Sequence, residues 1–360
     1  MTSVPAGPVS LVATGVIAAL VGVAAVTIGQ SVRLARRDRR RESARDDLRR
    51  ELLTRLARGD DADWAAWVAG FDATDRAVVE DILKTFLDRL RGPDRRHLRD
   101  LGQALGLGER ARRKLLEGDR FDRLEALTWV ALLAVPVDAT TLREHCGGDR
   151  HGRAAAARVL HEQGHPEATA IGTDLLLSSG EALSTLGLDT LYRLNRDDPT
   201  TLVAAATDHA TDWDNPLLIQ VLRVVGACGP SDPDASLTWI PVLFVEDSAR
   251  VRAAAARALE GYGWRPEVRT AADLDLLCDD DAPTVRRAAY RMLGAWGTED
   301  ARERLRNALA DDPNARARLV AARELYRLSG ERPTVEEWHG PGRPVSLAFR
   351  WVEANEAIRS

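Results

Sequence analysis

The sequence predicts an all-α fold in which short helix pairs stack into a solenoid. The main observation is one helical motif that occurs four times, beginning at Arg153, Arg252, Arg286 and Arg318. The last three copies begin at nearly equal intervals, and the interval between the first two copies is three times as long. A regular period of this length indicates stacked repeats that each pack only on their neighbours, and such arrays generally bind other molecules.

The composition agrees with a helical array and narrows the range of functions. Aromatic residues make up only 5% of the 360 residues, which favours closely packed helices over sheets. The net charge of −5 argues against nucleic acid as the main ligand. We interpret the excess of arginine over lysine, 48 to 2, as the codon usage of a GC-rich bacterium. The three widely separated cysteines (Cys146, Cys228 and Cys278) indicate buried thiols in a reducing compartment.

No charged side chain occurs before Arg33, and residues 9–31 are predicted to form a transmembrane helix. Within it, the uniformly apolar and small residues 9–29 would span about 31 Å as a helix, close to the thickness of a bilayer core. Arginines follow it directly, at positions 33, 36, 37, 39, 40, 41, 45, 49 and 50. The positive-inside rule therefore places residues 1–8 outside and the rest of the chain in the cytoplasm of a single-pass cell-membrane protein. A cleaved signal peptide would need its positive charge before the apolar run.

The cytoplasmic part divides into four predicted regions. An arginine-rich juxtamembrane helix covers 32–58, and a helical N-terminal part of the solenoid covers 60–117. The repeats occupy 118–330, and an amphipathic segment at 331–360 is expected to cap the last repeat. The juxtamembrane arginines either contact anionic lipid or only fix the topology, and the interleaved acids favour topology alone. These acids are Asp38, Glu42, Asp46 and Asp47.

Each copy of the motif contains the signals of a closely packed helix. The alanine runs allow two helices to approach closely, and valine and leucine fill the seam between them. Each copy follows an aspartate that is predicted to cap the helix: Asp149, Asp247, Asp281 and Asp312. Three copies end in a glycine at the same position, which is predicted to form a left-handed C-terminal cap: Gly164, Gly263 and Gly297.

The motif resembles the HEAT-repeat family, in the short bacterial form also found in phycobilin-lyase-type repeats. The residues that carry the resemblance are Asp247, Val251, Arg252, Ala254, Ala255, Leu259 and Gly263, and Asp281, Val285, Arg286, Ala288, Ala289, Leu293 and Gly297. The resemblance covers residues 120–330 and implies a right-handed α-α superhelix of the armadillo-like kind. It also implies a ladder in which the aspartate and the first arginine pair between repeats. The ladder residues would be Asp149, Arg153, Asp247, Arg252, Asp281, Arg286, Asp312 and Arg318.

A second arginine in every copy is a candidate binding residue. It lies five positions after the first arginine, about 140° around the helix, so the two cannot share a face. By resemblance, the second helix of each repeat lines the inner surface of the solenoid, where a row of arginines could bind an acidic partner. The alternative is that these arginines pair with local acids. The four residues are Arg158, Arg257, Arg291 and Arg323.

The search for catalytic or metal-binding residues finds no convincing constellation. The densest cluster of potential ligands is His145, Cys146, His151, His161 and His165, which lacks the repeated spacing of a metal site. HEAT-repeat hydroxylases bind iron through several His-Glu pairs, whereas this chain has only His161-Glu162. No catalytic residue, cofactor, metal or small-molecule substrate is therefore predicted.

These observations favour a membrane-tethered cytoplasmic scaffold or adaptor over an enzyme. The solenoid is expected to bind a protein partner, which includes partners that are themselves embedded in the membrane, and residues 9–31 are expected to hold it at the bilayer. An enzyme or enzyme subunit of the HEAT-like lyase type is the alternative, and a nucleic-acid-binding solenoid is the third. The missing ligands weigh against the lyase, and the net acidity weighs against nucleic acid.

Overall fold

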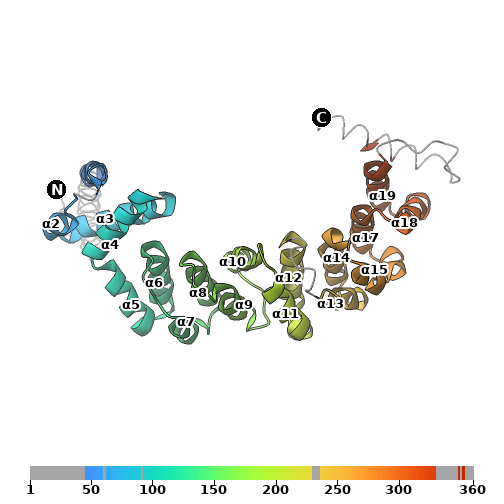
Figure 1. The fold of residues 1–360 in the computed structure, drawn as a ribbon, viewed down its shortest axis with the longest axis horizontal. Coiled ribbons are helices and arrows are strands. Elements are labelled where there is room, and N and C mark those ends of the chain that lie inside the picture. Colours follow the sequence, from blue (N-terminus) through green and yellow to red (C-terminus); the bar gives the residue numbers. More distant parts are fainter. Residues whose placement is uncertain are drawn as a thin grey trace, which may run out of the picture. The chain divides into compact units, whose positions relative to one another are not determined.

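A computed structural model describes residues 45–59, 62–90, 92–228, 236–329, 348 and 351–352. Every regular element within these ranges is helical, in agreement with the predicted all-α class (Figure 1). No helix in the described ranges is both long enough and apolar enough to cross a bilayer. The predicted stub at 1–8, the transmembrane helix at 9–31, the juxtamembrane residues up to 44 and nearly all of 331–360 lie outside the described residues.

The chain divides into two units, of which the first comprises Met1–Arg113 and Leu132–Val135. It contains a helix over residues 45–56, then α2 (Trp64–Ala69), α3 (Ala73–Arg89), α4 (Pro93–Ala104) and the start of α5 (Leu107–Glu117). Leucines that are fully buried form its core, among them Leu83, Leu98 and Leu101. The Asp72 side chain begins α3 with a capping box, because it accepts the Thr74 and Asp75 N–H groups while the Asp75 carboxylate accepts the Asp72 N–H.

The second unit, Lys114–Ala131 and Pro136–Ser360, consists mainly of two rows of helices (Figure 1). After α6 (Arg120–Leu133), the first-helix row contains α7 (Ala139–Cys146), α9 (Ala168–Leu177), α11 (Thr200–His209), α13 (Trp239–Val242), α16 (Leu274–Cys278) and α18 (Glu299–Asp311). The second-helix row contains α8 (Arg150–Glu162), α10 (Thr185–Asn195), α12 (Asn215–Cys228), α14 (Ala249–Ala258), α17 (Pro283–Trp296) and α19 (Ala315–Ser329). Short elements complete the unit: η2 (Ala210–Asp212), η3 (Leu243–Val245), η4 (Glu260–Tyr262) and α15 (Pro266–Ala271).

Each helix of the second-helix row contacts the next one, from α8 through to α19. Small residues make this packing possible: a Cβ atom on Gly226 of α12 would lie only 3.1 Å from the Ala258 Cα atom of α14. Val251 and Val285 are fully buried in the seam, as the motif predicts. Ala317 takes the corresponding place in α19 and is also fully buried, so a smaller side chain fills the last seam.

The first arginines of the motif join neighbouring repeats through buried ion pairs. Arg252 donates from Nε and Nη2 to the two carboxylate oxygens of Asp280, at 2.6 and 3.0 Å. Arg286 makes the same two-pronged contact with Asp312, at 2.8 and 2.9 Å. The Asp280 and Asp312 side chains are only 6% and 1% exposed. We call each such pair a rung of the ladder.

The third guanidinium nitrogen ties each arginine to its own repeat. Nη1 of Arg252 donates to the Glu246 carbonyl at 2.6 Å, and Nη1 of Arg286 donates to the Asp280 carbonyl at 2.6 Å. In both cases the acceptor lies in the turn that precedes the arginine's own helix. Each guanidinium is therefore fixed at both ends, because one edge binds its own loop and the other binds the next repeat.

Electrostatics keep the rung carboxylates ionised. Burial by itself would raise the pKa of Asp312, but the Arg286 guanidinium, the Asn314 N–H and the Tyr290 hydroxyl together hold this pKa below its usual value. The Tyr290 hydroxyl donates to Asp312 Oδ2 at 2.7 Å. The pKa of Asp280 is lowered in the same way, by Arg252 and the Ala282 N–H against the effect of burial. A charged pair is thus the stable form of each rung.

Asp312 pairs with the arginine of the neighbouring repeat as predicted, whereas the acid that binds Arg252 is Asp280, one position before the predicted Asp281. Asp281 is exposed and contributes only its carbonyl, which accepts from Arg286 Nη1 at 3.2 Å. Asp247 likewise contributes its carbonyl to Arg252, at 3.0 Å. The helix caps differ from prediction for the same residues, because the N-cap residues of α14 and α17 are Ser248 and Ala282, and neither side chain makes a cap hydrogen bond. The reason for the shift from Asp281 to Asp280 is geometric, since the turn before α17 buries the Asp280 side chain and leaves Asp281 exposed.

The outer copies of the motif lack a complete rung within the described residues. Arg153 donates to the Gly147 carbonyl at 3.0 Å, but its partner in the next repeat is the Ser179 hydroxyl, at 2.7 Å. Asp149 caps α8 by accepting the Gly152 N–H at 2.9 Å, as predicted. Its carboxylate pairs with Arg120 at 3.0 Å rather than with a ladder arginine. Arg318 donates to the Asp312 carbonyl. This bond corresponds to the contacts that Arg252 and Arg286 make with the turn before their own helices.

A second repeated contact joins neighbouring repeats near the C-terminal ends of the second-row helices. The Tyr262 hydroxyl donates to the Val225 carbonyl at 3.1 Å, and the Trp296 indole N–H donates to the Leu259 carbonyl at 2.9 Å. This contact explains why Gly263 differs from the predicted left-handed cap, with a φ of −63°. A Cβ atom on Gly263 would lie 2.2 Å from a Trp296 ring atom, so the glycine makes room for the indole. Gly164 and Gly297 do adopt the predicted left-handed conformation.

The neighbouring aspartates Asp280 and Asp281 provide a matched test of the ladder. We expect Asp280→Ala to lower the free energy of unfolding by about 3 kcal/mol, because it leaves the Arg252 guanidinium without its buried partner. Asp281→Ala removes an exposed carboxylate and should change this free energy by less than about 0.5 kcal/mol. Urea denaturation followed by circular dichroism measures both values. Equal losses in the two variants would contradict the assignment of Asp280 to the rung.

Candidate partner-binding surface

The second arginines of the motif lie on the second-helix row, and the structure separates one of them from the rest. Arg158 of α8 forms an ion pair with Asp189 of α10, and its side chain is only 19% exposed. Asp189 also accepts from Arg193 Nε at 2.8 Å. Arg158 is therefore part of an inter-repeat contact, and it does not belong to an open arginine surface. Arg158 therefore follows the alternative prediction, in which a second arginine pairs with a nearby acid.

The other three second arginines are exposed on successive helices. Arg257 lies on α14, Arg291 on α17 and Arg323 on α19, and each of these helices contacts the next. The structure adds a fourth residue, the exposed Arg223 of α12, which occupies the equivalent position one repeat before Arg257. We call these four residues (Arg223, Arg257, Arg291 and Arg323) the arginine row. In α10 the equivalent position, one repeat before Arg223, is occupied by Asp189.

Sequence reasoning missed Arg223 because its helix lacks the rest of the motif. Leu218 stands where the ladder arginine would be, and the alanine run is replaced by the larger residues Ile, Gln, Val and Leu at 219–222. The repeat period alone could have identified it, since the spacing from Arg223 to Arg257 equals that from Arg257 to Arg291. The second arginine therefore recurs more regularly along these helices than the rest of the motif does.

Three members of the row have no hydrogen-bond acceptor or ion-pair partner among the described residues: Arg223, Arg257 and Arg291. Their charges repel one another. Burial, followed by the nearby Arg291, lowers the pKa of Arg257, and Arg223 and Arg287 act in the same direction. Glu260 is the acid that opposes this effect. Exposed guanidinium groups on neighbouring helices, with Glu260 as the acid acting on Arg257, favour the binding of an anion.

The two acids near the row are directed inward. Burial raises the pKa of Glu260, even though the charges of Arg291 and Arg257 act to lower it. Glu324 is 9% exposed and pairs with Arg327 Nε at 2.9 Å. It packs in the space that Gly294 of α17 leaves, because a Cβ atom there would lie 2.4 Å from its Oε2 atom. The surface of the row is therefore more cationic than its residue count suggests.

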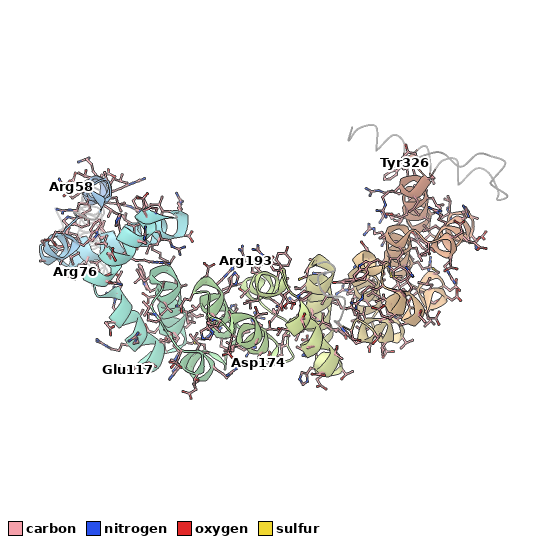
Figure 2. The ribbon with its side chains drawn as sticks, in the orientation of Figure 1. Arg58, Arg76, Glu117, Asp174, Arg193 and Tyr326 are labelled. Carbon is pink, nitrogen blue, oxygen red and sulfur yellow. The ribbon has the colours of Figure 1, made fainter. Side chains whose placement is uncertain are left out.

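Figure 2 shows the two faces of the second unit. Arg193 of α10 lies on the side formed by the second-helix row, and Asp174 of α9 lies on the opposite side. Asp174 is held there by Arg143, at 3.0 Å. The charges of Arg158, Asp189 and Arg193 on α8 and α10 are paired, and the arginine row begins on the next helix of the second-helix row, α12.

The described residues contain no group of three or more side chains that could hold a metal ion. His165 Nδ1 accepts the Glu167 N–H at 3.1 Å, and burial lowers the pKa of His161. Burial also raises the pKa of Cys146 to about 11, so this thiol is protonated at neutral pH.

A cavity of about 600 Å³ lies beside the Arg286–Asp312 rung, and Arg286, Tyr290 and Asp312 line it.

Comparison with known proteins places a family resemblance on the same part of the chain. Residues 236–326 match the family model of HEAT repeats. This range contains both complete rungs and three of the four arginine-row residues. No curated protein and no solved structure matches the chain. The match and the all-helical, two-row arrangement support the HEAT-repeat resemblance for this part of the solenoid.

Arg223, Arg257 and Arg291 lack partners among the described residues, which predicts that these three arginines contribute little to folding. The triple variant Arg223→Gln, Arg257→Gln, Arg291→Gln should unfold within about 1 kcal/mol of the parent chain, because it removes no hydrogen bond and relieves repulsion. Arg286→Gln serves as the control and should cost about 3 kcal/mol, since it leaves Asp312 buried and unpaired. Urea denaturation measures both. A large loss in the triple variant would show that the row has a structural role.

Proposed function

We propose that this chain is a protein-binding scaffold and that its arginine row binds an acidic segment of the partner. HEAT repeats are in general protein-interaction scaffolds, and residues 236–326 match their family model. Stacked repeats present an extended surface suited to a partner that crosses several of them. Arginine is also the side chain best suited to carboxylates, because its planar guanidinium binds both oxygens at once.

One observation carries this proposal. Three other arginines of the second-helix row, Arg158, Arg252 and Arg286, pair with acids of the next repeat. Arg223, Arg257 and Arg291 form no such pair with a described residue, although they lie on three helices in mutual contact. Repulsion among them is a cost to the free protein, and a bound carboxylate would relieve it. The surface is arranged for an external anion.

An acidic protein segment accounts for this surface better than nucleic acid does. The chain has a net charge of −5, so a nucleic acid would meet general repulsion away from the row. The charges of the half-buried Glu260 and the buried Glu324 beside the row would also oppose a continuous phosphate backbone bound along it. A protein segment can place apolar or neutral residues opposite these two acids.

The proposal includes a membrane tether. Its support comes from the sequence, in which residues 9–31 are free of charge and a run of arginines follows them. A helix of this length would hold the solenoid within a short distance of the inner face of the bilayer. The partner would then be a membrane protein or a protein that is recruited to the membrane. Recovery of the native chain in the soluble fraction after alkaline extraction would contradict the tether.

Crosslinking in native membranes tests the function. The parent chain should capture a partner through a segment rich in Asp and Glu, identified by mass spectrometry of the crosslinked peptides. Reversing the row (Arg223→Glu, Arg257→Glu, Arg291→Glu) should lower the captured amount at least about tenfold, because attraction becomes repulsion. The matched control reverses three arginines of the first-helix row: Arg143, Arg302 and Arg306. Equal capture by all three chains would overturn the proposed role of the arginine row.

A further inference from the structure

The surface beside the arginine row changes character at α10. Asp189 takes the arginine position there, and Arg158 and Arg193 neutralise it. On the same face of this helix, about one turn before and after Asp189, lie Leu186 and Tyr192, which are 42% and 38% exposed. The row surface is therefore cationic over α12, α14, α17 and α19, whereas over α10 it carries a neutralised charge cluster flanked by exposed apolar side chains. A partner segment that follows this surface must change from acidic to apolar in the same direction.

The repeat spacing restricts the conformation of that segment. Packed helices lie about 8–10 Å apart, so successive arginines of the row recur at about this distance. An extended polyproline II chain has three residues per turn and rises about 9 Å over them, which brings every third side chain to the same face at the matching interval. A β-strand would turn every third side chain to the opposite face. A helix would match only at every seventh residue, with a rise of about 10.5 Å that drifts out of step across four arginines.

We propose, on the basis of the proposed function, that the arginine row binds a polyproline II-like segment with a carboxylate at every third position. The segment carries a large apolar residue at the end that lies over Leu186 and Tyr192. Four acidic positions and one apolar position span about 13 residues at this spacing. The intervening residues pass over Glu260 and Glu324 and carry no negative charge. The arginines thus set the register, and the apolar contact on α10 sets the direction.

Synthetic peptides test this inference on the full chain in lipid nanodiscs. The matching peptide has Glu at every third position, Pro and Ala between, and Trp at one end. A second peptide has the same composition with the Glu residues permuted, a third has Ser in place of Trp, and a fourth is an Ala-rich helix with Glu at every seventh position. Fluorescence anisotropy should show that the matching peptide binds at least about tenfold tighter than the permuted and helical peptides.

Variants of the chain separate the two contacts. Arg223→Gln should weaken binding of the matching and the Ser-ended peptides about tenfold alike, because both lose the same carboxylate contact. The double variant Leu186→Ser, Tyr192→Ser should weaken only the Trp-ended peptide, by about fivefold. An equal effect of this double variant on both peptides would overturn the apolar end of the proposal. Urea denaturation of each variant confirms that it is folded.

The outcomes distinguish this inference from the proposed function. If the permuted or helical peptide binds as tightly as the matching one, and reversing the row abolishes binding of all of them, the extended register is wrong while the acidic partner stands. If reversing the row changes no peptide's affinity, both proposals fail. Tighter binding of single-stranded DNA or of anionic lipid vesicles than of every peptide, lost in the reversed chain, would replace the protein partner with that class of ligand.

Discussion

The two-pronged pair between an arginine of one repeat and an aspartate of the next is the interaction on which the repeats from α14 to α19 depend. Arg286 shows its extent: the guanidinium binds both Asp312 oxygens and the Asp280 carbonyl, and Tyr290 binds the same carboxylate. Because such a rung fixes the rotation of its helix, it also fixes where the residue five positions later points. Arg257 and Arg291 lie on the surface because Arg252 and Arg286 are held in the seam.

The arginine row follows from this constraint together with the choice of residue at one position per repeat. Along the second-helix row that position is Arg158, Asp189, Arg223, Arg257, Arg291 and Arg323. The single aspartate neutralises the arginine before it and separates that arginine from the remainder. A change of one residue type in one repeat thus sets the boundary of the proposed binding surface, while the helix packing continues past it.

Helix periodicity made the repeat arrangement and the arginines of the ladder predictable, since residues inside a helix keep a fixed phase. Residues in turns lack that regularity, which is why the ladder acid proved to be Asp280 rather than Asp281. The role of Gly263 was equally hidden, because it depends on Trp296 of the following repeat. Arg223 was predictable from the period, but not from the motif, and the pairing of Arg158 depended on Asp189 in a repeat with a divergent sequence.

Site-specific photo-crosslinking tests most directly whether the arginine row is the surface that meets the partner. A photoreactive residue placed at Ala295, exposed one turn after Arg291, should form a crosslink to an acidic segment of the partner, and the same residue at Ala227 on α12 should crosslink a neighbouring stretch of that segment. Val242, which is 67% exposed on the first-helix row, is the matched comparison and should give no such product. Crosslinks from Val242 alone would contradict the account and place the partner on the opposite face.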